Sequence, residues 1–488
     1  MDIIYSSKPF LAVCIASLAS ILIMASRRKP NLREAWSVLG AAATFLTVLS
    51  MTPEVLAGKT IECTPFTILP GISFKFRVDA LGMLFATISS FLWIVVSFYN
   101  IGYMRALEEH AQTRYYHCFA VAIVGAVGVA FSGNLFSFYL FYELITIYTY
   151  PLVAHHQDAE AFEGGRKYMV YLTGTAKAFL LPAIVLTYVM TGTLDFPMGI
   201  EKGMFPADAN PLLVTLTYIF YIAGLTKAAI MPLHNWLPSA MVAPTPVSAL
   251  LHAVAVVKAG VFCICRVMLS VFGVNLLDGL NLGLPTAVIA GITIVTASVI
   301  ALTKDDLKAR LAYSTVSQLS YVVLGVALLT PSGITGGLIH IANHAFSKIT
   351  LFMGAGAIYV ALHTKKISEL SGAGRQMPFT MAAFGIASLS MIGVPLVCGF
   401  VSKWYLIMGA LEAKAQFILY ILLASTILNT AYFAPILYKA YFEKPKEDQG
   451  YHEAPAFMVV PLMLTALASV LMGLFPDYFM NIVKAVLR

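Results

Sequence analysis

The chain has 488 residues, of which 59% are hydrophobic and only 11% charged, with a mean hydropathy of +0.82 and a net charge of +7. Soluble domains carry roughly 25% charged residues, so this composition excludes an ordinary soluble protein and predicts an all-α polytopic membrane protein. The net charge does not indicate a nucleic-acid partner, because an excess of Lys and Arg on one side of a membrane accounts for much of it.

Apolar runs long enough to cross a bilayer recur along the whole chain. A spanning helix needs about 20 residues, and about fourteen runs approach this length. The predicted spans are 9–26, 35–52, 78–102, 115–132, 134–154, 167–190, 212–231, 246–271, 283–302, 312–329, 335–362, 379–408, 416–437 and 456–476. The longest polar connections, around 53–77 and 191–211, are rich in Pro and Gly, and no soluble domain fits between the helices.

The basic residues predict an orientation for these helices. The loops on one face, including 27–33, 304–310 and 365–375, carry about twice as many Lys and Arg residues as the loops on the other face. By the positive-inside rule, the richer face is cytoplasmic. We therefore expect a multi-pass protein of the cell inner (plasma) membrane with both termini outside.

Lys227 interrupts an aliphatic helix within the segment 224–238. An ammonium group at bilayer depth costs about 2.5–3.5 kcal/mol on insertion scales, so its presence there points to function. Pro232 follows shortly afterwards, lacks a backbone N–H and opens the helical hydrogen-bond ladder beside the charge. A buried charge next to a broken helix is what an ion path through a membrane needs.

Other charged groups share this position inside the predicted helices. They are Lys177, Lys258, Lys348, Lys403 and Glu143. Of the 24 carboxylates, only Glu143 sits deep in a span. Hard cations such as sodium want several oxygen ligands, so a bare sodium site is disfavoured, although unwound carbonyls could still build one. A buried lysine can lose its proton near neutral pH, so protons fit this set better.

Glu143 beside Lys227 would form a proton switch. Two unit charges about 4 Å apart interact by roughly 4 kcal/mol at an effective dielectric of 20. The carboxylate would hold Lys227 protonated when it is near and would let the proton leave when a helix shift moves it away. The alternative is a structural ion pair without a transport role.

His340, His344 and Lys348 recur every four residues, so they lie along one helical face with a rise of about 6 Å per step. Titratable groups at this spacing can line a water-filled path. The alternatives are a polar packing seam or a metal site, but no Cys, Asp or Glu stands nearby to complete the latter. Lys258 lies too deep in its span to reach the surface easily, and His252 is either a relay group or a histidine held by a hydrogen bond.

Lys403, within the segment 393–404, has a setting like that of Lys227. Both lysines follow a hydroxyl residue, and both lie in apolar helices disturbed by Pro and Gly. Paired interrupted helices in two parts of a chain are the usual pointer to an inverted repeat and its transport site.

The motifs around these residues resemble the antiporter-like subunits of respiratory complex I. The same family includes subunits of Mrp-type cation/proton antiporters and of membrane-bound hydrogenases. The resemblance covers about residues 75–440 and rests on the segments 134–144, 224–246, 305–319 and 339–348.

The resemblance implies a core of two inverted five-helix repeats with helices 7 and 12 interrupted. The implied division is 1–110 for peripheral helices 1–3, 115–271 for helices 4–8, 283–437 for helices 9–13, and 438–488 for a loop and helix 14. Two features make the D-type Mrp subunit or its hydrogenase counterpart the most similar subunit type. One is Lys403, and the other is that the sequence stops soon after helix 14 without a long lateral helix.

The resemblance also implies roles for single residues. Glu143 and Lys227 would form the coupling pair, Lys258 the central relay and Lys403 the exit-side proton group, with the 340–348 face connecting them. Lys177 departs from the family pattern, which has a small or aliphatic residue there. It is either a second partner of Glu143 or a contact to a neighbouring subunit.

The predicted function is proton translocation within a complex whose other membrane subunits are the partners, with sodium passing through the complex where it is exchanged. The alternative is a self-sufficient secondary transporter whose lysines bind a small anionic solute. The six cysteines form no CxxC pair, and no phosphate loop, dinucleotide fingerprint or haem motif is present. We therefore predict no cofactor, no metal and no catalytic residue in this chain. A driving redox reaction, as in an NADH-quinone oxidoreductase-like or hydrogenase-like complex, would take place in partner subunits.

Overall fold

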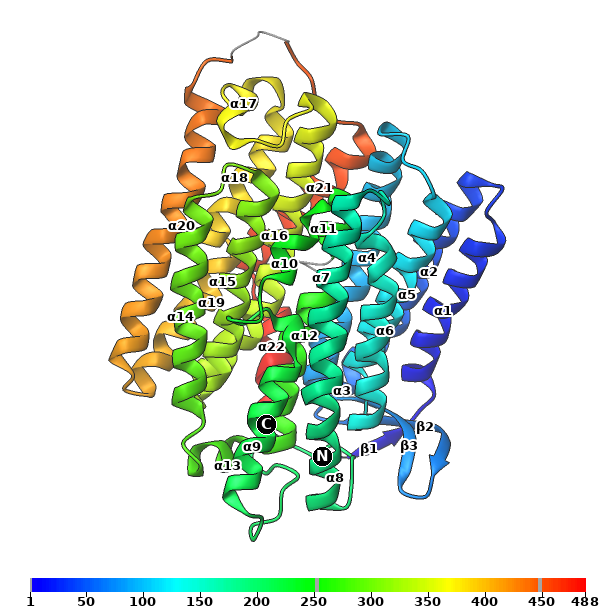
Figure 1. Cartoon of the computed structure of the whole chain (residues 1–488), viewed down its shortest axis with the longest axis vertical. Coiled ribbons are helices and arrows are strands. Elements are labelled where there is room, and N and C mark those ends of the chain that lie inside the picture. Colours follow the sequence, from blue (N-terminus) through cyan, green and yellow to red (C-terminus); the bar gives the residue numbers. More distant parts are fainter. Residues whose placement is uncertain (1, 251–253, 446–449) are drawn as a thin grey trace.

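Long helices that run close to one common axis make up most of the molecule (Figure 1). The computed structural model describes residues 2–250, 254–445 and 450–488. Both termini lie at the same end of the bundle (Figure 1). The helices pack side by side, as expected where each must satisfy its own backbone hydrogen bonds in an apolar surrounding.

Nine helices in the described residues are long and apolar enough to cross a membrane. They are α1 (Lys8–Ala25), α2 with the short α3 (together Pro30–Leu56), α4 (Ala80–Ala106), α5 (Gln112–Ala130), α7 continuing into α8 (together Ala159–Thr191), α14 (Gly283–Leu302), α16 (Pro331–Leu362), α20 (Gln416–Phe442) and α21 (Ala456–Leu474). The chain is therefore a multi-pass membrane protein.

The remaining helices are shorter, broken or more polar. They are α6 (Leu135–Val153), α9 (Pro211–Gly224), α10 (Trp236–Ser239), α11 (Thr245–Ala249), α12 (Val256–Arg266), α13 (Val274–Gly279), α15 (Leu307–Ala327), α17 (Ala373–Gln376), α18 (Pro378–Ile392), α19 (Cys398–Glu412) and α22 (Asp477–Val486). Both α6 and α15 have the length of a span but are rich in Tyr, Ser, Thr or Gln side chains.

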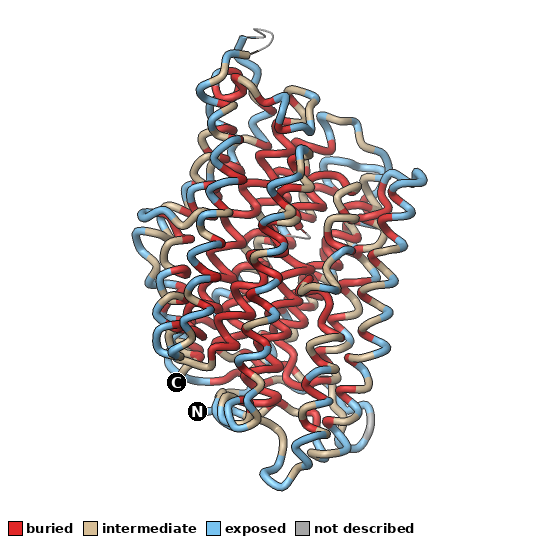
Figure 2. The backbone as a smooth tube through the Cα atoms, turned by 60° about the vertical axis from the view of Figure 1, so that its left-hand side comes forward, coloured by how far each residue is buried: buried red, intermediate tan, exposed pale blue. Residues whose placement is uncertain are grey.

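The helices divide into an interior set and an outer set. In α4, α5 and α16, 83% of the residues in the apolar 18-residue stretch of the helix are buried inside the protein. In the α7–α8 helix only 28% of such a stretch is buried. Figure 2 shows the same division, with buried backbone running through the middle of the bundle and exposed segments around it. The predicted His and Lys face of α16 therefore lies inside the protein.

Both helices predicted with interruptions are broken. After Gly224 at the end of α9, a 3-10 turn (Thr226–Ala228) replaces the α-helix, and α18 and α19 are separated by 393–397. Within the predicted span 246–271, the described residues form α11 and α12. A π-helical turn, Ala176–Leu180, lies between α7 and α8 and carries Lys177.

A three-stranded sheet lies at the end of the bundle near the termini (Figure 1). Strand β1 (Ile3–Tyr5) pairs in parallel with β2 (Thr60–Leu69), and β2 forms an antiparallel hairpin with β3 (Ile72–Val78). The sequence analysis read this region as a polar connection, so the all-α class needs correction here. The overlooked signals are a Pro-Gly turn and the alternating polar and apolar residues of β3.

Ion pairs lie within the sheet and between the segments next to it. Arg77 of β3 pairs with Glu62 of β2 at 2.7 Å, and Lys75 reaches Asp195 at 2.9 Å. Arg266, at the end of α12, forms a two-pronged contact with Asp79, the N-cap of α4. Two parallel N–H to carboxylate bonds fix orientation as well as distance, so the ends of α4 and α12 are held together.

Candidate functional site

Lys227 lies in the 3-10 turn that follows α9, and its side chain is fully buried. Helix α12 crosses this turn at Gly260, where an added Cβ would overlap the backbone of Lys227 and Ala228. Only glycine allows this approach without displacing the turn. The break therefore brings a lysine from the end of α9 against the side of α12.

Tyr142 of α6 holds the ammonium group of Lys227. The Lys227 Nζ donates to the main-chain carbonyl of Tyr142 at 2.8 Å and lies 3.0 Å from the centre of its ring. The Tyr142 hydroxyl donates to the Gly224 carbonyl at 3.4 Å. A desolvated cation over an aromatic face gains about 2 kcal/mol. Tyr142 thus compensates part of the cost of burying Lys227, a role that the sequence analysis did not assign.

Glu143, the next residue on α6, is half-buried. Its Oε1 atom is enclosed and has no hydrogen-bond partner among the described residues. The charges of Lys227 and, second, Lys177 act on this carboxylate, although Lys177 itself is exposed on the π-helical turn. Since Lys227 donates to the Tyr142 carbonyl, its interaction with Glu143 is electrostatic and involves no direct hydrogen bond.

Lys258 of α12 meets His344 of α16 in the interior of the bundle. The Lys258 Nζ lies 2.6 Å from His344 Nδ1, and both side chains are almost completely buried. The two residues are 86 positions apart in the sequence. The structure therefore joins two of the predicted site residues by a direct hydrogen bond.

His340 continues the row one turn along α16. Its ring centre lies 5.8 Å from that of His344 and 5.4 Å from that of Tyr321. Its Nδ1 bonds to Ser402 Oγ at 2.8 Å, and its Nε2 bonds to Gln318 Oε1 at 3.1 Å. Both ring nitrogens are thus satisfied, and the bond to Ser402 connects α16 to α19.

Lys403 follows Ser402 on α19 and points at the broken end of α18. Its Nζ donates to the carbonyls of Met391 and Ile392 at 2.9 and 2.7 Å, and lies 5.6 Å from the centre of the Tyr321 ring. Carbonyls at the C-terminus of a helix have no partner within the helix and carry its negative dipole end. The break after α18 therefore supplies two hydrogen-bond acceptors for the Lys403 ammonium group.

Lys348 does not continue the row of histidines. Its Nζ donates to Ser314 Oγ of α15 at 2.8 Å. The Ser314 hydroxyl lies 3.0 Å from that of Tyr432, which bonds to Asn429, and Asn429 in turn donates to the Met391 carbonyl at 3.4 Å. This side branch therefore ends on one of the carbonyls that hold the α19 lysine.

The predicted site residues thus fall into three groups. Lys227 and Glu143 lie at the α6–α9 contact; Lys258, His344, His340 and Lys403 follow one another through the interior; and Lys348 occupies the branch. No hydrogen bond connects the first group to the second among the described residues. His252 lies outside the described residues. The linking side chains that the sequence analysis missed, such as Gln318, Ser402 and Tyr432, are ordinary polar residues made specific only by the packing of distant helices.

An open cavity of about 670 Å³ lies on the face that carries the loops after α4 and α6. It is lined by several charged groups, among them Glu109, Asp158, Glu163 and Lys308, and it extends to Thr245 at the start of α11. Burial raises the pKa of the Glu109 carboxyl, but contacts with His155, His156 and His110 outweigh this and hold the pKa below its ordinary value. Glu109 is therefore a carboxylate at neutral pH.

Comparison with known proteins shows which family the chain resembles. Residues 132–429 match the family described as NADH:quinone oxidoreductase/Mrp antiporter, transmembrane. The chain is 30% identical to NADH-quinone oxidoreductase subunit N of Desulforudis audaxviator, over 96% of this chain and 97% of that protein. It is 31% identical to a probable K⁺/H⁺ antiporter A/B subunit of Rhizobium meliloti, over 89% of this chain but only 44% of that protein.

Solved structures have the same fold. A chain of the membrane-bound sulfane sulfur reductase, an archaeal respiratory membrane complex, gives a TM-score of 0.88 at 25% identity, covering 98% of this chain and 97% of that one. A chain of the Mrp complex from a Dietzia species gives a TM-score of 0.87 at 20% identity, covering 99% and 96%. At that lower identity the likeness concerns the fold alone.

Proposed function

This chain belongs to the NADH:quinone oxidoreductase/Mrp antiporter transmembrane family, and from that premise we propose that it is a proton-translocating subunit of a multi-subunit membrane complex. The proposed path runs through Glu143 and Lys227, then Lys258, then the His344–His340 row, to Lys403. The solved relatives are chains of membrane complexes, which supports partner subunits for this chain as well.

The contact between Lys258 and His344 carries this proposal. An ammonium group and an imidazolium have no lone pair to accept a hydrogen bond, so two nitrogens 2.6 Å apart must share one proton. Lys258 charged and His344 neutral, or the reverse, differ only by the transfer of that proton. Such a pair can carry out one step of proton transfer, and two interior helices hold its two side chains in place.

At both ends of the path, the lysine ammonium group has acceptors within the protein. Lys227 is held by a carbonyl and an aromatic ring, and Lys403 by two carbonyls at a helix end. Positive charges along a buried row repel one another strongly, because the effective dielectric is low. A proton that arrives at one end therefore favours release at the other, and movement of Glu143 relative to Lys227 would set this cycle in motion.

The remaining predicted residues take supporting roles in the proposal. Lys348 supplies a second polar route to the Met391 carbonyl through Ser314 and Tyr432. Lys177, exposed on the π-helical turn, tunes the charge on Glu143, and His252 is a further candidate relay group.

We further propose that the chain has fourteen spans and two inverted repeats, 115–271 and 283–437, flanked by 1–110 and 438–488. The breaks after α9 and after α18 support this division, because each places a lysine at an interrupted helix. The face whose loops carry more Lys and Arg residues would be on the cytoplasmic side of the plasma membrane, with both termini outside. Sodium exchange or a redox reaction in partner subunits, in a D-type Mrp or hydrogenase-like setting, would supply the driving force.

Glu143→Gln is expected to slow proton movement by the assembled complex by roughly 10-fold or more, because a neutral amide cannot alternate the charge that acts on Lys227. The measurement is the pH change inside inverted membrane vesicles while the complex works. Glu201→Gln, on an exposed acid in the loop before α9 and outside the 670 Å³ cavity, is the matched control. Wild-type rates for Glu143→Gln would show that this acid is only structural.

A further inference from the structure

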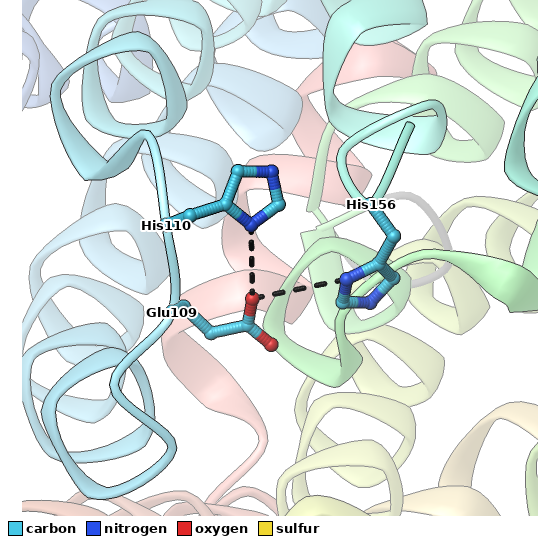
Figure 3. Close-up of side chains that lie close together, drawn as sticks. All are labelled: Glu109, His110 and His156. Carbon is cyan, nitrogen blue, oxygen red and sulfur yellow. Dashed lines mark ion pairs between the residues drawn. The ribbon is translucent and has the colours of Figure 1, made fainter. Parts of the chain in front are cut away.

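Three imidazoles surround one carboxylate oxygen at the mouth of the 670 Å³ cavity. His155 Nε2, His156 Nδ1 and His110 Nδ1 lie 3.5, 3.8 and 3.9 Å from Glu109 Oε2. Figure 3 shows His110 and His156 directed at this oxygen from the loop after α4 and the loop after α6. The pathway proposed above uses none of these four side chains.

The spacing suits a metal ion better than it suits hydrogen bonds. The ligand atoms of Glu109, His110 and His156 all lie within 4.8 Å of one another. In a tetrahedral zinc site with bonds of about 2.0–2.1 Å, neighbouring ligand atoms are roughly 3.4 Å apart. A modest inward movement of the two exposed histidines, His110 and His156, would bring their ring nitrogens and the Glu109 oxygen to bonding distance from one ion.

His155 provides an independent indication of a missing ligand. Its side chain is completely buried; its Nδ1 has no hydrogen-bond partner among the described residues, and its Nε2 lies 3.5 Å from Glu109 Oε2. Its ring centre lies 4.7 Å from that of His110 and 5.5 Å from that of His156. Buried polar atoms are seldom left unsatisfied, so a group that accepts an imidazole lone pair is expected here.

We propose that Glu109, His110 and His156, completed by the buried His155, form a binding site for a divalent transition-metal ion of the zinc type, and that the bound ion hinders proton access to the path. Imidazole and carboxylate ligands suit zinc and similar borderline metals. The second half rests on the proposed function, since Glu109 and His156 line the cavity that opens toward α11. A bound dication would neutralise Glu109 and repel protons at this mouth.

The sequence analysis predicted no metal site because it examined clusters within single helices. The four residues come from two loops about 45 positions apart, and only the packing of α4 against α5, and of α5 against α6, unites them. Neither loop alone carries more than two of the four proposed ligands.

The test uses the purified whole complex and zinc chloride as the probe. Zinc retained after gel filtration is counted by elemental analysis, and zinc affinity is measured by calorimetry. We expect the double variant His110→Gln/His156→Gln to retain one zinc fewer, or to bind it at least about 10-fold more weakly. His363→Gln, an exposed histidine just after α16, is the matched control and should retain the wild-type zinc content.

A second measurement tests the effect on transport. Zinc added to proteoliposomes on the side of these loops should slow proton movement by the wild type, and the double variant, compared with its own zinc-free rate, should resist it. His155→Gln should weaken inhibition as well. Equal zinc content and inhibition in all proteins would overturn the site. Loss of zinc binding without loss of inhibition would overturn the proposal that the bound ion hinders proton access. If the wild-type complex moved no protons even without zinc, the proposed function itself would be refuted.

Discussion

Lys227→Met is expected to abolish proton movement coupled to the driving reaction, with a loss of roughly 10²-fold or more, while the complex still assembles. Lys227 carries the one titratable group of the 3-10 turn after α9, and positioned proton-transfer groups contribute factors of this size. Assembly should survive, because an apolar side chain of similar length in place of a buried charge is often neutral or stabilising. Fluorescence quenching of a pH-sensitive dye in inverted vesicles measures the rate.

Two comparisons make the Lys227 result specific. Lys202→Met removes an exposed lysine from a loop and should pump at the wild-type rate. The amount of each variant in the purified complex, measured from gel bands, separates a transport defect from poor assembly. Normal pumping by a fully assembled Lys227→Met complex would remove this lysine from the mechanism.

Lys258→Met is expected to stop proton movement as completely as loss of Lys227. It removes one of the two nitrogens that share a proton at 2.6 Å and leaves His344 without this donor. Lys258→Arg sharpens the test, because arginine keeps the positive charge but does not release its proton in proteins. A relay predicts that both variants are inactive in the vesicle assay. If position 258 needs only a positive charge, the Lys258→Arg complex should move protons. Activity of this variant would therefore contradict a relay at this position.

Sequence reasoning singled out the buried charged residues but not all of their hydrogen-bond partners. Lys227 was recognisable because Gly224 and Pro232 disturb an aliphatic run around a charge, and the structure has its break there. The periodic spacing of His340, His344 and Lys348 correctly placed them on one helix. It could not show that each contacts a different neighbour, because those neighbours lie on α12, α15 and α19.

Other misses have equally physical causes. Ser314 and Tyr432 are ordinary residues in an apolar helix until tertiary packing brings their hydroxyl groups within hydrogen-bond distance. The exposure of Lys177 depends on a π-helical turn, which changes the direction of side chains without a reliable sequence signal.

The proposed function requires a hydrated row of side chains that carries protons between the broken helices. A density map of the whole complex, at a resolution that shows water, tests it most directly. We predict ordered water joining Lys227 to Lys258 and leading from Lys403 to the membrane surface. Apolar side chains or lipid filling the space between these lysines, with no water in any driven state, would contradict the account.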